Sequence, residues 1–298
     1  MTVTDNPAVA IIIVAWNGKD DTLECLKSLR GLTYSNHQII LVDNGSTDGT
    51  VAAVRSGFPD VTILEMARNL RFAGGNNKGI EFALGKGADH ILLLNNDTVV
   101  EKDFLSALVK RMQSDTGIGM VAPKISYFAP PETIWFAGAR IGYWTGTMSH
   151  VGIRQKDSGQ FDRSGETDYA TGCCVLVRRE VVEAVGALDE SYFMYAEDAD
   201  WSVRARRRGF SIVYEPLAMI RHRVSASAGG NLSLFKLRNK FVSQMRFFSR
   251  YASWYHWLVF PWLSILMNLV LLLSQVFSRK PNPAPNYSDS RKSIDGKK

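Results

Sequence analysis

The segment that decides the fold is ILLLNNDTVV, residues 91–100. Four apolar residues, 91–94, run directly into Asn95, Asn96 and Asp97 without an intervening glycine or proline. A continuous apolar run of this kind is typical of a strand that is buried on both faces, as in a parallel sheet. A strand end that carries two amides and a carboxylate indicates either a capped turn or a place where a ligand is held.

Three earlier segments repeat this pattern of an apolar run followed by polar residues. The earlier apolar runs are residues 9–16 (VAIIIVAW), 38–43 (QIILVD) and 61–66 (VTILEM). Segments of helical periodicity follow the four runs at residues 20–32, 51–58, 76–84 and 101–114. Strands that alternate with helices indicate βαβ units. The sequence therefore predicts an α/β fold with a mostly parallel central sheet flanked by helices, in which ligands bind beyond the carboxyl ends of the strands.

The pattern is weaker in the second half of the chain. Residues 118–169 are rich in Gly, Trp, Tyr and Pro and contain only short strand-like pieces. Residues 171–190 again predict a strand and a short helix. Residues 197–210 predict a helix that ends at Gly209, and residues 211–216 predict a further strand.

Composition and charge restrict the class of protein. The chain has 298 residues, is 46% hydrophobic and carries a formal charge of +6, so it can bury a substantial core. Much of the basic excess lies after Arg204, which favours an anionic partner or a membrane near the C-terminal third over a nucleic acid.

The cysteines and the N-terminus favour a cytoplasmic protein. Cys25, Cys173 and Cys174 make neither a disulfide framework nor a C-x-x-C metal motif, which favours a reducing compartment. The N-terminal segment has no Lys or Arg before its apolar run, so it lacks the basic region of a secretory signal.

The C-terminal region differs in composition from the rest. Residues 232–250 are apolar and basic together, and residues 251–277 contain no Asp, Glu, Lys or Arg. This length suffices for a transmembrane helix, although the run contains Pro261, Asn268 and Gln275, and a buried core helix is the alternative. Basic flanks and tryptophans suit a membrane interface, and whether the segment spans, re-enters or lies flat stays open. The tryptophans are Trp254, Trp257 and Trp262. Residues 279–298 predict a disordered tail.

The familiar phosphate-binding loops are missing from the sequence. It contains no G-x-x-x-x-G-K-[ST] motif, and neither the turn after residues 9–16 nor the glycines of residues 69–79 match G-x-G-x-x-G. A P-loop protein is therefore excluded, and a nicotinamide enzyme is disfavoured.

The polar strand ends each allow a functional and a structural interpretation. Asp43 suits a ribose hydroxyl or a base N–H, or it forms an Asx-turn with Ser46 as the next helix cap. Arg68 pairs with a phosphate or is a solvated loop arginine. Asp97 supplies the carboxylate that a divalent cation on a diphosphate needs, or it caps the helix that begins near Glu101.

A second acidic cluster comprises Glu197, Asp198 and Asp200. Three carboxylates so close together repel one another, which can raise a pKa toward the working range of a base. The alternative is an ordinary acidic helix N-terminus. His222, between two arginines, is either a neutral imidazole ligand or a solvent-exposed histidine.

Six segments in order resemble family 2 glycosyltransferases, and most of all their bacterial rhamnosyltransferase-like branch. They are VAWN, LVDNGSTDGT, RNLRFAGGNNKG, LLLNNDT, TGCCVLVRREVVEAVGALDESYFMYAEDADWSVRARRRG and RHRVSAS, and they cover roughly residues 9–227. The resemblance implies a GT-A fold, a nucleotide-diphospho-sugar donor, a divalent cation (Mg²⁺ or Mn²⁺) and inversion at the anomeric carbon.

The resemblance also implies roles for particular residues. Asp43 would contact the nucleotide, Asp97 and His222 would bind the metal, and Asp198 would be the catalytic base. The other residues expected at the nucleotide-sugar are Ala15, Asn17, Asn44, Ser46, Arg68, Asn69, Gly75, Asn76, Asn95 and Asn96. Those expected near the acceptor are Gly172, Glu197, Asp200 and Trp201. The family's first D-x-D aspartate is replaced by Asn95, so metal binding would rest more heavily on Asp97.

These features predict three regions. The first is a GT-A domain at 1–227, which divides into a nucleotide-sugar half (1–117) and an acceptor half (118–227). The second is a basic, hydrophobic, membrane-associated region at 228–278, and the third is the tail at 279–298. We expect sugar transfer to a lipid-linked or polymeric glycan at the cytoplasmic face of the membrane, in cell-envelope glycan synthesis. The protein would be peripheral or anchored by one C-terminal segment; an oligomer is compatible with this, and no nucleic-acid partner is expected. The alternatives are a sugar nucleotidyltransferase and a non-catalytic membrane scaffold.

Overall fold

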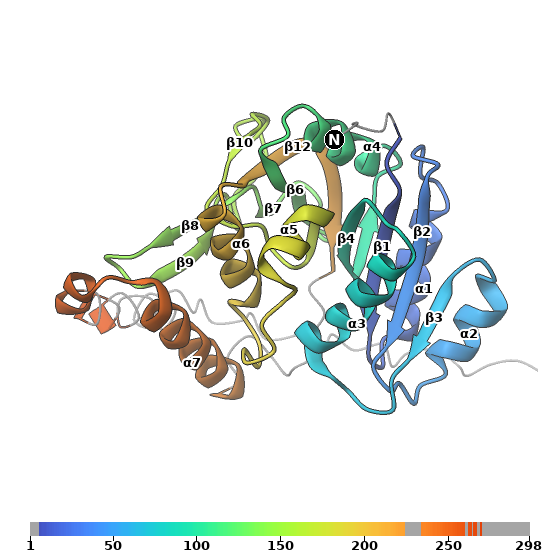
Figure 1. Ribbon diagram of the computed structural model, residues 1–298, viewed down its shortest axis with the longest axis horizontal. Coiled ribbons are helices and arrows are strands. Elements are labelled where there is room, and N and C mark those ends of the chain that lie inside the picture. The colour runs from blue at the N-terminus through green and yellow to red at the C-terminus, as the bar shows by residue number, and fades with distance from the viewer. Residues whose placement is uncertain (1–5, 224–233, 260–261, 264, 267–268, 270–298) are drawn as a thin grey trace, which may run out of the picture.

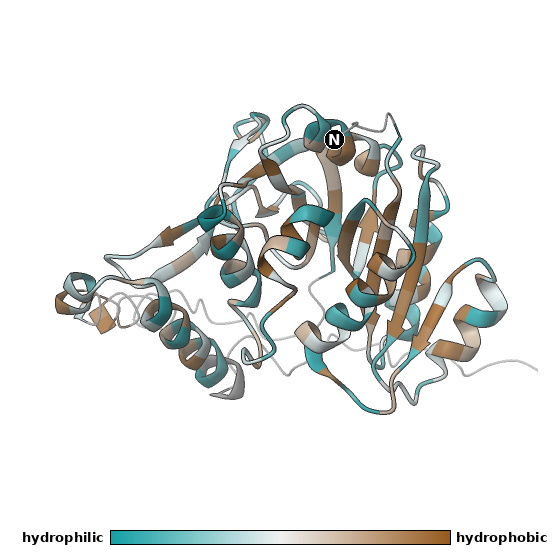
Figure 2. Cartoon of the chain, in the orientation of Figure 1, coloured by the Kyte–Doolittle hydropathy of each residue, from teal (hydrophilic) through white to brown (hydrophobic). Residues whose placement is uncertain are grey.

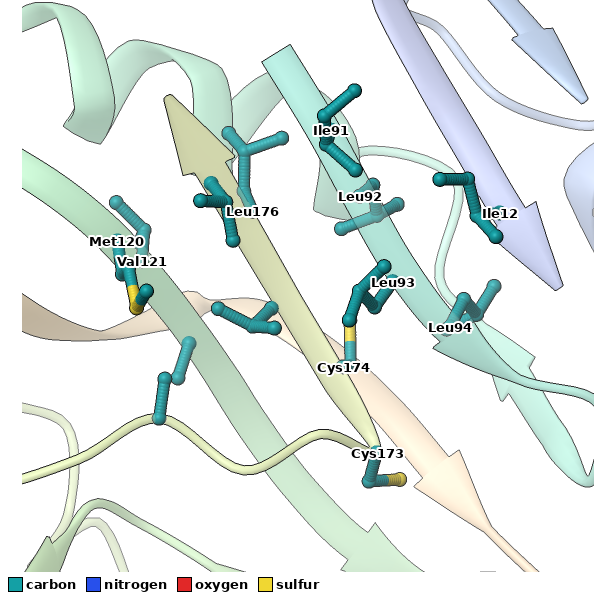
Figure 3. Packing of buried hydrophobic residues seen from close by; sticks show 14 of the residues in the cluster. Ile12, Ile91, Leu92, Leu93, Leu94, Met120, Val121, Cys173, Cys174 and Leu176 are labelled. Carbon is teal, nitrogen blue, oxygen red and sulfur yellow. The ribbon is translucent and has the colours of Figure 1, made fainter. Parts of the chain in front are cut away.

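The N-terminal half of the chain forms a parallel sheet around the segment ILLLNN. The computed structural model describes residues 6–223, 234–259, 262–263, 265–266 and 269 (Figure 1). The parallel strands are β1 (Val9–Ala15), β2 (His37–Asp43), β3 (Thr62–Glu65) and β4 (His90–Asn95), in the order β4-β1-β2-β3. Ile91, Leu92, Leu93 and Leu94 are buried between the neighbouring strands, with Ile12 of β1 on one side (Figure 3). The prediction of a buried strand at this segment is confirmed.

Helices connect these strands where the periodicity predicts them. They are α1 (Lys19–Leu29), α2 (Thr50–Gly57), α3 (Arg71–Gly85) and α4 (Phe104–Gln113). α3 packs on β1 and β2, where Gly79 allows the close approach: a Cβ at this position would lie 2.4 Å from Cγ2 of Ile12. The prediction began α3 at residue 76, and the helix in fact begins five residues earlier.

The second half of the chain extends the sheet with strands of mixed direction. The order continues from β4 to β11 (Cys174–Arg178), β6 (Ile118–Tyr127), β12 (Ser211–His222) and β10 (Gly165–Glu166). β11 runs antiparallel to both β4 and β6, whereas β12 runs parallel to β6. Short β5 (Thr98–Val100) pairs with β12, and β7 (Ile134–Phe136) pairs with β6, both antiparallel. The prediction of a mostly parallel sheet therefore holds for β1–β4, and the sheet as a whole is mixed.

The weak pattern at residues 118–169 conceals a long buried strand. Nine of the ten residues of β6 are buried, although Gly119, Pro123 and Lys124 interrupt its apolar character. Lys124 is tolerated there because Asp157 and Asp162 pair with its ammonium group. The rest of this region includes a separate hairpin of β8 (Ala139–Gly142) and β9 (Thr147–His150).

Helices α5, α6 and α7 and a short 3₁₀ helix lie in the described part of the second half. α5 (Arg179–Val185) and α6 (Glu197–Arg207) pack together, and α7 (Leu234–Tyr251) is followed by the 3₁₀ helix η1 (Trp254–Leu258). Hydrophobic residues are concentrated in the sheet, whereas hydrophilic and hydrophobic residues alternate along α7 (Figure 2). Among the described residues, no helix is long and apolar enough to cross a membrane. Much of the predicted segment 251–277, and all of the predicted tail at 279–298, lies outside the described residues.

Candidate active site

The polar strand ends meet at one edge of the sheet. Ala15 of β1 lies opposite Asp43 of β2, which in turn lies opposite Glu65 of β3, and Val14 lies opposite Asn95 of β4. Because parallel strands in register end at the same edge, the polar clusters that follow them are brought together. β11 runs in the opposite direction, so the residues just before it, including Gly172, also lie at this edge.

Asp43 occupies a buried turn at the end of β2. Its Oδ2 accepts hydrogen bonds from the N–H groups of Gly45 (3.2 Å) and Ser46 (3.0 Å), which is the predicted Asx-turn. Ser46 does not cap the next helix: its Oγ accepts from the N–H of Asn17 at 3.0 Å, and Gly49 is the N-cap of α2. Asp43 Oδ1 is buried and has no hydrogen-bond partner among the described residues. A buried carboxylate oxygen without a partner is costly, so this atom is suited to a donor group from a ligand.

Asn44 connects the end of β2 to the start of α3. Its Nδ2 donates to the carbonyl of Arg71 (3.1 Å), and its Oδ1 accepts from the N–H of Leu70 (3.4 Å). Gly75 packs against Asn44, because a Cβ there would lie 2.9 Å from Asn44 Nδ2. Buried Asn76 donates to the carbonyl of Phe72 at 2.9 Å. These three predicted binding residues thus hold the backbone around the strand ends.

The remaining residues predicted to bind the nucleotide-sugar differ in exposure. Arg68 and Asn69 lie exposed in the loop before α3, whereas Ala15 is fully buried. Asn17 is exposed, and its Oδ1 accepts from the N–H of Thr47 at 2.8 Å. Asn96 donates to Thr22 Oγ1 at 3.0 Å.

Asp97 and His222 lie side by side although they are far apart in sequence. β5 pairs with the end of β12 and places Thr98 opposite His222, which brings Asp97 Oδ1 to 3.1 Å from His222 Nε2. Trp135 packs edge-on against the imidazole with the ring centroids 4.6 Å apart. The alternative that Asp97 caps a helix near Glu101 is wrong, since α4 begins at Phe104 and its N-cap is Asp103.

The Asp97–His222 pair has the donor chemistry of a divalent cation site. Carboxylates and imidazoles are both groups that bind divalent metals, and His222 Nδ1 is buried without a hydrogen-bond partner among the described residues. No cluster of three or more His, Cys, Asp or Glu that could hold a metal occurs in the part of the chain that the structure describes. Two protein ligands fit a cation whose shell is completed by diphosphate oxygens and water.

Asp198 is held at the same edge by the backbone before β11. Its Oδ2 accepts from the N–H of Gly172 (2.9 Å), and its Oδ1 accepts from the N–H of Ala199 (2.8 Å). Gly172 has no space for a side chain, because a Cβ would lie 2.8 Å from Cζ of Phe72. Immediately before α6, Tyr195 and Ala196 both adopt left-handed backbone conformations, with φ of 71° and 69°. Two such non-glycine residues in succession are strained, and strain of this kind clusters at functional sites.

Burial changes the acidity of the carboxyl groups in this helix turn. It raises the pKa of Asp198, which the backbone hydrogen bonds from Gly172 and Ala199 oppose. Burial, followed by the charge of Asp198, raises the pKa of Glu197 to about 8. We therefore expect Glu197 to keep its proton at neutral pH, whereas the backbone N–H groups of Gly172 and Ala199 favour the ionised form of Asp198.

The backbone of residues 172–173 links the two carboxylate sites. The N–H of Gly172 donates to Asp198, and the carbonyl of Cys173 accepts from the N–H of Asn95, two residues before Asp97. Burial raises the pKa of the Cys173 thiol, and the negative charges of both Asp97 and Asp198 add to this effect. Both carboxylates thus lie near this one buried thiol.

Asp200 and Trp201 face the protein interior. Asp200 is fully buried, with Arg204 Nε at 2.8 Å, Arg250 at 2.8 Å and Tyr251 Oη at 2.7 Å. Trp201 is 1% exposed and donates its indole N–H to the carbonyl of Gly186. The burial of both side chains does not support the expectation that they face the acceptor, and that expectation stays a prediction.

Some residues at this edge carry no recognisable sequence signal. Arg223 binds Asp21 (3.3 Å) and Glu24 (2.5 Å) of α1. In the sequence Arg223 is 202 residues from Asp21 and 199 residues from Glu24. Arg71 stacks on the ring of Phe193 at 3.9 Å from its centroid. Only the folded chain brings these pairs together.

Comparison with known proteins agrees with the resemblance seen in the motifs. The chain belongs to glycosyl transferase family 2, since the model of that family matches residues 10–186, more than half of its length. An uncharacterized protein of Sinorhizobium fredii is 30% identical over 234 residues, which are 75% of this chain and only 25% of that protein. An N-acetylglucosaminyl-diphospho-decaprenol L-rhamnosyltransferase of Mycobacterium tuberculosis is 29% identical over 226 residues, 68% of this chain and 72% of the relative.

The fold is GT-A-like. A mannosyltransferase from Pyrobaculum calidifontis, solved in complex with GDP-Man and Mn²⁺, superimposes with a TM-score of 0.63. The two share 18% sequence identity, and the match covers 93% of this chain and 78% of the mannosyltransferase. At this level of identity the similarity establishes the fold alone.

Proposed function

We propose that this protein transfers a sugar from a nucleotide-diphosphate donor to a glycan acceptor, with inversion at the anomeric carbon. The observation that carries the proposal is the meeting of Asp43, the Asp97–His222 pair and Asp198 at one edge of the sheet. These residues come from four separate segments of the chain. Their chemistry matches the three parts of such a reaction: nucleoside recognition, diphosphate stabilisation and proton removal.

The donor would lie across the ends of β1 and β2. The unpartnered Asp43 Oδ1 would accept a hydrogen bond from a ribose hydroxyl or a base N–H. Asp97 and His222 would hold a divalent cation, Mg²⁺ or Mn²⁺, which stabilises the negative charge on a departing diphosphate. Arg68, exposed in the neighbouring loop, would add a positive charge toward the phosphates.

Asp198 would act as the general base. It would take the proton of the acceptor hydroxyl while that oxygen forms a bond to the anomeric carbon and the bond from this carbon to the diphosphate oxygen breaks. The raised pKa of Asp198 makes it a better proton acceptor than an exposed aspartate. Its hydrogen bond from Gly172 fixes one carboxylate oxygen and orients the group.

The relatives suggest the chemistry of the substrates. The name of the rhamnosyltransferase relative describes an N-acetylglucosaminyl group carried on diphospho-decaprenol. We propose dTDP-rhamnose or a UDP-sugar as donor, and a lipid-linked or polymeric glycan of the cell envelope as acceptor. A lipid-linked acceptor would bring the enzyme to a membrane surface, and we propose that this is the cytoplasmic face.

The C-terminal region supports a position at the membrane surface. From residue 216 to residue 288 the sequence contains no Asp or Glu, while Lys and Arg recur. A basic segment with exposed tryptophans, such as Trp254 at 76% and Trp262 at 74% exposure, is typical of attachment to anionic lipid headgroups.

A transfer assay with a panel of donors tests the proposal. The purified chain is incubated with membrane extract, Mg²⁺ or Mn²⁺ and each donor in turn, and mass spectrometry identifies the product. We expect one donor to add a single sugar to a lipid-linked or polymeric glycan. Release of pyrophosphate from a nucleoside triphosphate would instead support a nucleotidyltransferase. Failure to bind any donor would support a non-catalytic scaffold.

A further inference from the structure

The inner face of α7 holds the segment that leads to the proposed base. Ser243 donates to the carbonyl of Met194 at 2.7 Å, and the guanidinium of Arg246 donates to the carbonyl of Ser191. Arg250 binds Asp189 at 2.7 Å. We name residues 189–196 the catalytic loop, because they lead directly into α6 and Asp198. α7 therefore contacts this loop at residues 189, 191 and 194.

Asp200 links α7 to the catalytic helix itself. Its Oδ1 receives hydrogen bonds from Arg250 (2.8 Å) and Tyr251 (2.7 Å) of α7, while Arg204 of α6 binds Oδ2. The carboxylate is fully buried, so loss of these donors would leave an inadequately compensated charge in the interior. Asp200 lies two residues after Asp198, so its hydrogen bonds from Arg250 and Tyr251 connect α7 to the first turn of α6.

The outer face of α7 and the adjoining elements are apolar, aromatic and basic. Phe241 and Val242 of α7 are 60% and 50% exposed, and Trp254 of η1 is 76% exposed. Trp144, in the β8–β9 turn, is 54% exposed and stacks on Tyr255 of η1 with the ring centroids 5.6 Å apart. We call this surface the docking face. With Lys240 exposed beside it and no acidic residue in residues 216–288, its charge complements an anionic bilayer.

We propose that α7 couples membrane attachment to the position of the catalytic base. An anionic bilayer engages the docking face, and the inner face of the same helix transmits this to α6 through Arg250, Tyr251 and Asp200. Arg250 and Tyr251 are positioning residues for Asp198. This inference rests on the proposed function for the identity of the base.

The physical basis of the coupling is linkage. A bilayer that binds α7 only while this helix is packed on the catalytic loop favours the packed state. It therefore stabilises the contacts that the inner face of α7 makes with the catalytic loop and Asp200. The left-handed conformations of Tyr195 and Ala196 are strained, so the loop depends on external contacts to keep its shape. Membrane attachment should therefore order the loop and raise turnover, with little effect on donor binding.

Hydrogen–deuterium exchange of the full chain tests the coupling without the need for a substrate. Phosphatidylglycerol vesicles should slow exchange across residues 189–200 several-fold in the wild type, whereas neutral phosphatidylcholine vesicles should not. Tyr251→Phe removes one hydroxyl, and Arg250→Gln removes one guanidinium. Both variants should bind the anionic vesicles as the wild type does and lose the slowing of exchange.

Kinetics supply the second readout, with the donor and acceptor that the wild type uses. Both variants should lower kcat about tenfold, the effect of losing one hydrogen bond to a charged group, and should leave the KM for the donor unchanged. Arg55→Gln is the matched control, because it removes an arginine from an exposed ion pair on α2 and should change neither readout. Phe241→Ser should weaken vesicle binding itself.

The possible outcomes separate the coupling from the proposed reaction. Unchanged exchange at residues 189–200 in the vesicle-bound wild type would overturn the coupling. The coupling would also fail if anionic vesicles slowed exchange in Tyr251→Phe as much as in the wild type. An equal response to neutral vesicles would overturn the proposal that the docking face binds an anionic bilayer. If the exchange response is present and no donor is turned over, the proposed function fails and the coupling of α7 to the loop stands. If transfer occurs without the response, only the coupling fails.

Discussion

Glu197 and Asp198 are adjacent in sequence and have different environments. Asp198 accepts backbone hydrogen bonds from Gly172 and Ala199, which favour its ionised form. Glu197 is 7% exposed, and its Oε2 is buried without a hydrogen-bond partner among the described residues. Backbone N–H groups therefore stabilise the charge of Asp198, whereas burial favours the protonated form of Glu197. The sequence indicates the cluster, and contacts made across the fold distinguish its members.

The role of Asp198 is tested by Asp198→Asn. The amide keeps the shape of the side chain and cannot accept the acceptor's proton, so we expect kcat to fall by about 10²–10⁴-fold. Nucleotide-sugar affinity, measured by calorimetry, should change little. Full turnover in this variant would remove the proposed base.

The role of Asp97 is tested by Asp97→Ala. Loss of the carboxylate should abolish the increase in nucleotide-diphosphate affinity that Mn²⁺ or Mg²⁺ produces, because His222 alone holds a divalent cation poorly. Titrations with and without EDTA measure this increase. Metal-dependent binding that survives the substitution would contradict the assignment of the metal site.

Glu197 should make the stability of the protein depend on pH. Its pKa is raised from the ordinary 4.5 to about 8, so the folded protein keeps a proton that the unfolded chain releases. The free energy of unfolding should therefore be highest below pH 4.5 with respect to this group, and should fall as the pH rises toward 8, by on the order of a few kcal/mol.

Urea unfolding of the wild type and Glu197→Gln at pH 5 and at about pH 8.5 measures this effect. The glutamine variant should lose much of the decline, since it cannot ionise. Glu183→Gln, which changes an exposed glutamate in an i,i+4 pair, is the control and should keep the decline. An equal decline in the wild type and Glu197→Gln would contradict the raised pKa.

At the scale of elements, α3 depends on glycine for its position on the sheet. In Gly79→Ala the new Cβ would meet Cγ2 of Ile12 at 2.4 Å, so the helix must move away from β1. We expect a loss of about 1–3 kcal/mol in the free energy of unfolding. Gly85→Ala, in the same helix, has open space around it and should be neutral or stabilising by up to about 1 kcal/mol. Urea titration of both variants distinguishes packing from helix propensity.

The elements themselves are predictable to different degrees. β1, β2 and β4 are evident from their apolar runs, because strands buried on both faces need apolar side chains throughout. β6 is equally buried but is not evident from the sequence, since the ion pairs of Lys124 with Asp157 and Asp162 form only on folding. The direction of β11 is likewise unreadable, because a single strand has the same pattern parallel or antiparallel.

At the scale of the whole molecule, attachment to lipid should depend on salt. Cosedimentation with phosphatidylglycerol vesicles should weaken as NaCl rises from about 50 to about 500 mM, because the contribution of Lys and Arg is screened beyond about 10 Å at 0.1 M. A residual affinity should persist, since Trp254 and Leu258 contribute apolar area that salt does not screen. Binding that is insensitive to salt would contradict the electrostatic contribution.

The sequence by itself determined the parallel half of the sheet, the polar strand ends and the family to which the chain belongs. Apolar periodicity, turn residues and the order of the motifs are local properties, and they survive without knowledge of the fold. From these alone Asp43, Asp97 and Asp198 could be singled out as candidates. The segment ILLLNNDTVV could be recognised as a strand that ends at a site.

Only the tertiary structure decided which of the candidates meet and which do not. Asp97 reaches His222 because β5 pairs with the end of β12, and Asp198 reaches the edge because β11 runs antiparallel to β4. Asp200 looked equivalent to Asp198 in sequence and is bound in the interior by α7. The physical reason is that strand pairing and burial join residues distant along the chain, and no local pattern specifies those partners.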